Sequence, residues 1–326
     1  MKKVFKVLLV ILLILVIGIG AVALYVKKAL PHVGAPADLT IQVTPRRVAH
    51  GKYLANNVAA CMLCHSGRDG SVYSNPIRQD QLGKGGERFG KEEGFPGNIY
   101  ASNLTPYALS KWTDGELFRA ITTGESKDGH ALFPIMNYPA YGRLDPEDIF
   151  SIIAYLRTLP SITNEMPVTK LDFPVNFIVN TMPGKANLEK KPDSNNITAY
   201  GRYLVRMASC VECHSKADKG QVIAGTEFGG GRDFSSANRP VVFSANITPD
   251  KETGIGNWTR ELFLRKFKQY ADSSYRPAPV GERDANTPMP WTSYAGMEEK
   301  DLSAIFAYLQ TLKPIHNMVR TLPVQR

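Results

Sequence analysis

Two short strings of reactive side chains stand out in the chain, Cys61-Met-Leu-Cys-His65 and Cys210-Val-Glu-Cys-His214. On a helix, cysteines at positions i and i+3 project from nearly the same face, so both thiols can reach one flat ligand. The histidine that follows can then present an imidazole nitrogen to a metal at the centre of that ligand. This pattern is typical of covalent haem attachment.

The same cysteines allow two other interpretations. A thiol–disulfide redox pair is expected between a strand and a helix, a setting that these strings lack, and a zinc site could be built from two Cys-x-x-Cys pairs. All four cysteines of the chain lie inside the two strings, so none is left for a structural disulfide. We favour haem because a histidine directly follows each pair.

The two strings belong to two copies of one longer pattern. His50-Gly-Lys-Tyr-Leu54 precedes the first string as Tyr200-Gly-Arg-Tyr-Leu204 precedes the second. The further matches are residues 100–106 with 243–249, 112–118 with 258–263, Met136 and Tyr141 with Met289 and Tyr294, and 149–156 with 302–309. Apolar residues in the last pair recur at i, i+3, i+4 and i+7, which indicates one face of a helix.

Local signals place helices within the first copy. Thr44, Thr113 and Asp145 each have the position of an N-cap, and the helix after Thr44 is expected to run to the first cysteine string. Gly124 and Pro160 are matching stop signals. Each copy is therefore expected to hold three or four helices joined by long loops.

We expect an all-α chain with two tandem domains, at residues 31–160 and 195–326. Residues 161–194 are rich in Pro, Asn and Lys without helical periodicity, which indicates a linker. A strand-like stretch at 173–179 could pair briefly within it. Residues 1–30 are expected to be a membrane anchor or a signal peptide.

The N-terminal segment contains Val7 to Val26, a run of twenty residues without a charge. As a helix this run is about 30 Å long, the thickness of the hydrocarbon core of a bilayer. The lysines before it favour a cytoplasmic N-terminus. Ala21-Val22-Ala23 resembles a cleavage site, but the run is longer than the apolar core of most signal peptides. We therefore expect a single-pass helix in the inner (cytoplasmic) membrane, with the rest of the chain in the periplasm or another extracytoplasmic space.

The formal net charge of +9 does not indicate a nucleic-acid partner. The first 30 residues hold five lysines and no acid, which is more than half of the excess. The remaining charge is spread along the chain without a basic stripe. We expect the membrane, and no nucleic acid, among the partners.

A sixth iron ligand would separate an electron carrier from a catalyst. Met136 and Met289 lie 71 and 75 residues after His65 and His214, at matching places in the two copies. A thioether is a soft ligand that raises the haem potential and fills the coordination sphere. The alternatives are a core methionine, or ligation of the first iron by His130, which could also border an open peroxidatic site.

Other side chains could contact a haem without binding its iron. Trp112 and Trp258 could touch the haem or simply belong to the core. Candidates for pairing with haem carboxylates are Arg78, Arg88, Arg232 and Arg239.

At these residues the chain resembles the class I cytochrome c family, in tandem, over nearly all of residues 45–160 and 195–315. The stretch from Asn246 to Trp258, Asn-Ile-Thr-Pro-Asp-Lys-Glu-Thr-Gly-Ile-Gly-Asn-Trp, is similar to the membrane-bound cytochrome c subunits of alcohol, gluconate and sorbitol dehydrogenases. Those subunits carry three haems and pass electrons from a dehydrogenase to quinone or an oxidase. This chain differs in having two haem motifs.

The resemblance implies two covalently bound haem c groups and a role in electron transfer. It gives Cys61, Cys64, Cys210 and Cys213 as attachment residues, His65 and His214 as proximal ligands, and Met136 and Met289 as distal ligands. We expect a dihaem c-type cytochrome that carries single electrons in a respiratory chain, between a dehydrogenase and a quinone-linked complex or terminal oxidase. No catalytic residue is expected. The alternatives are a dihaem peroxidase with one open iron, and an electron-transfer subunit of a dehydrogenase complex.

Overall fold

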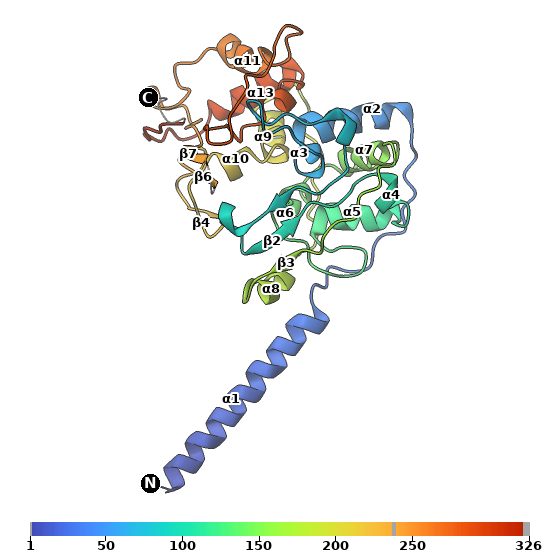
Figure 1. Cartoon of the computed structure of the whole chain (residues 1–326), viewed down its shortest axis with the longest axis vertical. Helices are drawn as coiled ribbons and strands as arrows, with labels where there is room; N and C mark the ends of the chain where they lie inside the picture. Colours follow the sequence, from blue (N-terminus) through green and yellow to red (C-terminus); the bar gives the residue numbers. More distant parts are fainter. Residues whose placement is uncertain (1, 237–238, 322–326) are drawn as a thin grey trace.

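The computed structural model describes residues 2–236 and 239–321, which form one long helix and a helical body (Figure 1). The α-helices are α1 (Lys2–Ala29), α2 (Pro45–Tyr53), α3 (Cys61–His65), α4 (Pro106–Leu109), α5 (Asp114–Thr123), α6 (Tyr138–Tyr141), α7 (Pro146–Leu156), α8 (Val175–Ile178), α9 (Ile197–Met207), α10 (Cys210–Cys213), α11 (Arg260–Lys268), α12 (Trp291–Tyr294) and α13 (Glu299–Leu309). Shorter turns are η1 (Leu54–Val58), which is π-helical, η2 (Gln79–Gln81), η3 (Lys91–Glu93) and η4 (Val179–Thr181). The strands are β1 (Arg88–Phe89), β2 (Gly97–Tyr100), β3 (Lys170–Leu171), β4 (Ala217–Asp218), β5 (Gln221–Val222), β6 (Asp233–Ser236) and β7 (Arg239–Phe243).

The predicted helix starts are confirmed. Thr44 caps α2 by accepting a hydrogen bond from the backbone N–H of Arg47, and Asp145 caps α7. Thr113 and Glu116 form a reciprocal capping box at the start of α5. The helix after Thr44 does not reach the first cysteine string unbroken, because η1 follows it and Ala60 has a left-handed φ of 52°.

The all-α expectation is right only in its coarse form, because small antiparallel sheets accompany the helices. The largest has the order β1-β2-β3, and β4 pairs with β5 and β6 with β7. Strand β3 comes from the predicted linker and pairs with β2, with Gly97 opposite Leu171. The strand-like prediction for 173–179 is wrong, since α8 and η4 occupy that stretch.

One helix crossing is repeated in the two copies and builds the core of each. Helix α2 packs against α7, and α9 packs against α13. A side chain at Gly51 would place Cβ 1.8 Å from the backbone oxygen of Ser151, and one at Gly201 would place it 1.9 Å from that of Ala304. Both crossings therefore require a glycine so that the helix backbones can approach.

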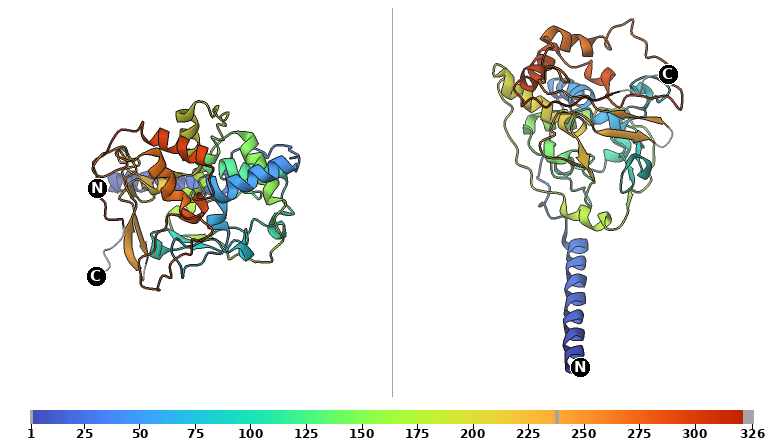
Figure 2. Two further views of the ribbon diagram at one scale, coloured as in Figure 1. Left: turned by 90° about the horizontal axis from the view of Figure 1, so that it is seen from above. Right: turned by 90° about the vertical axis from the view of Figure 1, so that its left-hand side faces the viewer.

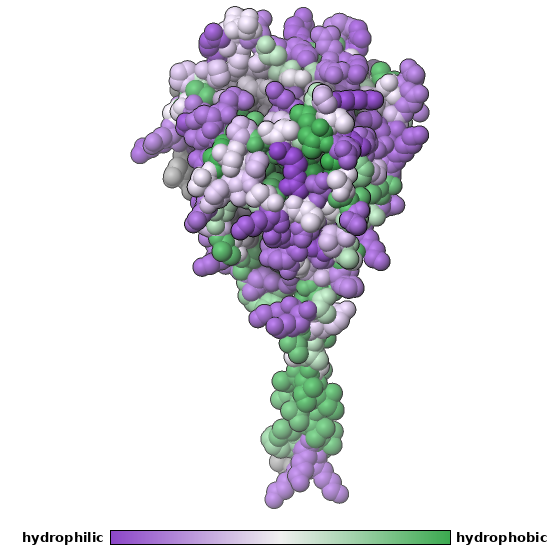
Figure 3. All heavy atoms as spheres, turned by 90° about the vertical axis from the view of Figure 1, so that its right-hand side faces the viewer, coloured by the Kyte–Doolittle hydropathy of each residue, from purple (hydrophilic) through white to green (hydrophobic). Residues whose placement is uncertain are grey.

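Helix α1 projects from the body as an apolar rod (Figure 1, Figure 3). Its large apolar side chains are exposed, and among the described residues it is the one helix long and apolar enough to cross a membrane. The structure therefore contains an N-terminal apolar helix that is a signal sequence or an anchor.

Candidate functional site

Both cysteine strings lie on short helices, α3 and α10, as predicted. The residue before the first cysteine has a left-handed backbone in each copy, with φ of 52° at Ala60 and 55° at Ser209. Residues other than glycine adopt this conformation only where the surroundings enforce it. The break separates the cysteine helix from the helix before it, so each string forms a separate turn.

The histidine of each string is held in one orientation by a backbone carbonyl. Nδ1–H of His65 donates to the oxygen of Ser102 at 2.7 Å, and Nδ1–H of His214 donates to that of Ala245 at 2.8 Å. Burial lowers the pKa of both imidazoles and favours their neutral form. A neutral ring that donates through Nδ1 keeps the lone pair on Nε2 for a metal.

In the first copy, the Asn-x-Thr-Pro motif fixes the carbonyl that orients the histidine. Asn103 directly follows Ser102, and its Oδ1 accepts a hydrogen bond from the backbone N–H of Thr105 at 2.8 Å. Its Nδ2 donates to the oxygen of Ile162 at 2.8 Å. The motif thus ties the loop beside the histidine to the segment that follows α7.

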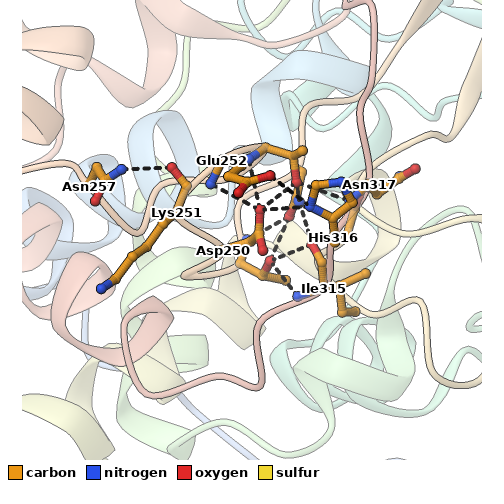
Figure 4. A network of polar contacts seen from close by, with 11 residues as sticks. Asp250, Lys251, Glu252, Asn257, Ile315, His316 and Asn317 are labelled. Carbon is orange, nitrogen blue, oxygen red and sulfur yellow. Dashed lines mark hydrogen bonds and ion pairs between the residues drawn. The ribbon is translucent and has the colours of Figure 1, made fainter.

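The second copy repeats these bonds and extends them. Asn246 donates to the oxygens of Ile315 at 2.7 Å and Thr253 at 3.0 Å, and Thr248 donates back to Asn246 at 2.7 Å. Figure 4 shows Ile315 and Asn317 beside Asp250 and Glu252 in this network. The Thr253 hydroxyl also accepts the backbone N–H of Asn317 at 3.0 Å. The Asn-Ile-Thr-Pro stretch therefore fastens the segment after α13 to the loop that holds His214.

In each copy a glycine lies against the backbone carbonyl that orients the histidine, Gly85 against that of Ser102 and Gly230 against that of Ala245. Gly85 N–H donates to the oxygen of His65 at 2.9 Å, and Gly230 N–H donates to that of His214 at 2.7 Å. Both glycines have φ of +72°, and a Cβ at Gly230 would lie 2.5 Å from the carbonyl carbon of Ala245. The position excludes any side chain.

The cysteine thiols are not prepared for thiolate chemistry. Burial raises the pKa of Cys61 and Cys210 to about 12 and that of Cys64 to about 11. Redox-active and zinc-binding cysteines act as thiolates, and redox pairs have lowered pKa values. Over residues 2–236 and 239–321 there is also no cluster of three or more His, Cys, Asp or Glu side chains that could hold a metal ion. The raised pKa values disfavour a redox pair, and the absence of such a cluster among these residues disfavours zinc.

The methionines of the repeat occupy turns that are tied to the cysteine helices. Met136 lies just before α6 and Met289 just before α12, and both side chains are half-buried. From α6, the Tyr141 hydroxyl donates to the oxygen of Ala59 at 3.3 Å. From α12, the Tyr294 hydroxyl donates to that of Ala208 at 3.0 Å. Each accepting residue comes two positions before the first cysteine of its string.

The two sites also contact each other. Asn137, next to Met136, donates to the Ser209 hydroxyl at 2.8 Å, directly before the second string. In the reverse direction, the Ser74 hydroxyl of the first copy donates to the oxygen of Met289 at 2.8 Å. The methionine turn of each copy is therefore bonded to a loop of the other copy.

Comparisons with known proteins agree with this geometry. The cytochrome c family model matches residues 198–313. The cytochrome subunit of fructose dehydrogenase from Gluconobacter japonicus is 30% identical over 279 residues, which are 81% of this chain and 52% of that protein. The chain belongs to the cytochrome c family.

Two further relatives widen the comparison. The cytochrome c subunit of the quinone-dependent alcohol dehydrogenase from Gluconacetobacter polyoxogenes is 26% identical, over 82% of this chain and 56% of its own length. A diheme cytochrome c-type protein from Cereibacter sphaeroides is 25% identical, over 60% of this chain and 72% of its own length. The cytochrome spans about half the length of the two dehydrogenase subunits. The family implies haem c binding and electron transfer.

The residues of the cytochrome fit a haem. Each cysteine helix offers two unpaired thiols and an oriented imidazole. Nε of Arg68, three residues after His65, is buried without a hydrogen-bond partner, and so is the hydroxyl of Tyr138, two residues after Met136. Arg68 is close enough to Cys64 to oppose the rise that burial causes in its pKa. A partly buried guanidinium near Cys64, with one N–H still free to donate, suits a haem carboxylate.

Of the four arginines predicted to pair with haem carboxylates, one lies near a cysteine of the strings. Arg232 donates to the oxygen of Glu212 at 2.6 Å and lies near Cys213. The other three have partners of their own: Arg78 pairs with Asp80, Arg88 with Glu92, and Arg239 with the oxygen of Gly70. Arg68 was not predicted, although its place three residues after His65 is a signal that could have found it.

The remaining candidates are His130 and the two tryptophans. His130 has a ring 62% exposed, and its Nδ1 binds Asp128 at 2.6 Å, which favours a surface loop over an iron ligand. Trp112 and Trp258 pack at the edge of the core, each with a lysine ammonium 5.8 Å from the ring centre. Both tryptophans therefore contact the core, which is one of the two roles expected for them.

Proposed function

We propose that the protein is a dihaem c-type cytochrome, tethered to the membrane by α1, that carries single electrons in a respiratory chain. The observation that carries this proposal is the duplicated histidine geometry, with bonds of 2.7 Å at His65 and 2.8 Å at His214. Each copy offers one imidazole nitrogen prepared for iron. A bound haem supplies one-electron exchange at its iron, and the protein sets potential and path through ligands and burial.

The proposed roles follow the repeat. Residues 31–160 and 195–326 would each form one haem domain, joined by the linker 161–194. The haems would be attached through Cys61, Cys64, Cys210 and Cys213, with His65 and His214 as proximal ligands and Met136 and Met289 as distal ligands. The contacts between the methionine turns and the opposite copies would keep the two haem sites at a fixed separation.

A membrane dehydrogenase is the proposed electron donor, with a quinone-linked complex or terminal oxidase as acceptor. The names of the relatives support this, since they are cytochrome subunits of fructose and alcohol dehydrogenases. Helix α1 would keep the haem domains at the periplasmic face of the inner membrane. In this role the protein makes and breaks no covalent bond of a substrate.

The haem count tests the proposal first. The full chain, matured with haem and purified in detergent, is expected to carry two haems per polypeptide in a pyridine haemochrome assay. Replacing Cys61 and Cys64 together with alanine should leave one haem, and so should replacing Cys210 and Cys213. One haem in the unmodified chain would contradict the dihaem proposal.

The ligands are tested on the same sample. We expect a ferric iron–methionine charge-transfer band from both haems that is unaffected by peroxide. Met136→Ala and Met289→Ala should each remove half of the band, while Met318→Ala, at an exposed position, should not change it. A band for one haem or none, with a peroxide-induced change of the haem spectrum, would support the peroxidase alternative instead.

A further inference from the structure

An apolar tip lies at the end of the body from which α1 emerges (Figure 1, Figure 2). We call residues 172–182 the linker tip; it contains α8 and η4. Phe173 is 79% exposed and Ile178 is 46% exposed. Phe173 makes an edge contact with Phe177, with ring centres 6.1 Å apart. Packing within the chain therefore does not explain these exposed side chains.

The linker tip is held in place at both ends. Before it, β3 pairs with β2 and the backbone N–H of Asp172 donates to the oxygen of Pro96 at 2.9 Å. Lys91 also pairs with Asp172 at 2.7 Å. After it, the N–H of Gly184 donates to the oxygen of Thr123 at 3.2 Å, and Val179 between the ends is buried. The exposed apolar side chains thus have a fixed position on the body.

The contact with α1 gives the depth of the tip relative to a membrane. Helix α1 packs against α8 and η4. Ala23 and Val26 are half-buried, whereas the described residues of α1 before them are exposed. Both belong to the last two turns of the apolar run from Val7 to Val26, which matches the hydrocarbon thickness of about 30 Å. A segment packed there lies at the boundary between hydrocarbon and headgroups.

Charges around the linker tip suit that boundary. Lys27 and Lys28 lie in the last turn of α1, and Lys170 and Lys185 are exposed on either side of the tip. Apolar side chains flanked by lysines are typical of segments that bind anionic phospholipid surfaces. Figure 3 shows apolar surface at the narrow end of the body, where it meets α1.

We propose that the linker tip is a second membrane contact, in which Phe173 and Ile178 enter the headgroup–acyl boundary of an anionic phospholipid bilayer. The proposal rests on the proposed role of α1 as an uncleaved anchor. A single helix would leave the body free to rotate about the helix axis. Two contacts fix one face of the body toward the membrane, and with it the direction in which the haem domains meet their partners.

The test uses the full chain with a cysteine introduced at the tip, Phe173→Cys or Ile178→Cys. Once haem attachment has used the native thiols, the new cysteine is labelled with an environment-sensitive fluorophore. The protein is placed in nanodiscs of phosphatidylethanolamine and phosphatidylglycerol, with or without lipids that carry a nitroxide quencher in the upper acyl chain. We expect a blue-shifted label that loses most of its fluorescence to the quencher.

The matched control is Met318→Cys. Met318 is 76% exposed, and the segment after α13 lies in the half of the body away from α1 (Figure 1). Its label should emit as in water and keep its fluorescence. A membrane-bound chain whose tip labels are unquenched, whether shielded from water or not, would overturn this proposal alone. Release of the full chain from membranes by alkaline carbonate would overturn the anchor, and this proposal with it.

Discussion

The hydroxyl of Tyr203 donates a hydrogen bond of 2.6 Å to Oδ2 of Asp148, across the boundary between the two copies of the repeat. The corresponding residues of the opposite copies, Tyr53 and Asp301, form the same bond at 2.6 Å. Both aspartates are 1% exposed. The copies therefore meet through an approximately two-fold, self-complementary contact, as in a symmetric dimer.

The two halves of this contact differ in charge. Asp148 also binds Nε2 of His50 at 2.8 Å and Nζ of Lys191 at 2.6 Å. Asp301 receives a second hydroxyl, that of Tyr200, at 3.0 Å. The histidine at position 50 thus has a structural role that its counterpart Tyr200 fills in a different way. A buried carboxylate with these partners is satisfied in both copies.

Removing the tyrosine hydroxyls that donate across the boundary should weaken the contact between the copies. Tyr203→Phe and Tyr53→Phe are each expected to lower the free energy of unfolding by about 1.5–3 kcal/mol, because each removes a hydrogen bond to a buried charged group. Urea unfolding of the holoprotein measures this change. Tyr107→Phe, at a side chain 41% exposed, is the control and should change little. Equal stability of all three variants would show that the crossing bonds contribute nothing.

Acid should weaken the same contact through Asp148. Burial opposes ionisation of this carboxyl, but hydrogen bonds from His50, Lys191 and Tyr203 outweigh burial and hold its pKa below the usual value. A lowered pKa in the folded state contributes stability above the unfolded pKa of about 4, and this contribution is lost as the pH falls further. Unfolding from pH 6 down to pH 3, in steps of about one unit, should show a smaller loss for Asp148→Asn than for the unmodified chain. Parallel curves would assign the acid sensitivity to other carboxyls.

Much of each copy could be predicted from local sequence. The caps at Thr44, Thr113 and Asp145 use side chains that bond to backbone groups within three residues, so their signal is local. The repeat also predicted that both histidine strings would share one geometry. The pairing of Lys170–Leu171 with β2 could not be predicted, because its partners lie about 70 residues away and two residues carry no periodicity.

The contact between the copies could not be predicted from the sequence, for a related reason. Tyr53 and Tyr203 are matching residues of the repeat, which suggests a shared role within each copy. In the structure each tyrosine bonds to the aspartate of the opposite copy. Two copies of one unit can pack in many relative orientations, and the sequence of one copy does not specify which side chains cross the boundary. The sequence therefore did not indicate that Asp148 and Asp301 accept hydrogen bonds from the opposite copy.

The close approach at Gly230 should make that position intolerant of a side chain. Gly230→Ala combines a left-handed φ of +72° with a Cβ 2.5 Å from the carbonyl carbon of Ala245, the residue that orients His214. We expect a loss of stability well above the roughly 1–2 kcal/mol that left-handed strain alone costs. Attachment of the haem proposed at Cys210 and Cys213 should fall, measured as haem per polypeptide.

Gly225→Ala is the matched control for this prediction. Its φ of +84° imposes the same kind of strain, but a Cβ there meets nothing within 4 Å. It should cost about 1–2 kcal/mol and leave haem attachment intact. If both variants behaved alike, the strain would account for the effect and the contact with Ala245 would not matter.

Arg68, near the first cysteine helix, should tune the potential of the haem proposed there. Arg68 pairs with Glu87, and its Nε is buried without a partner. A positive charge near a haem favours the reduced form, so Arg68→Ala should lower the potential of that haem. We expect a shift on the order of 60 mV, which changes a one-electron equilibrium about tenfold. Potentiometric titration of the full chain measures it.

Two further variants separate charge from packing in that titration. Arg68→Lys keeps the charge and should retain most of the potential, while losing the planar fork that suits a carboxylate. Arg78→Ala removes a charge from the surface, where Arg78 pairs with Asp80 at 3.1 Å and the side chain is 50% exposed. Solvent screens that site, so neither haem should shift measurably. If Arg68→Lys lowered the potential as far as Arg68→Ala, the effect would come from altered packing around Cys64 rather than from the positive charge.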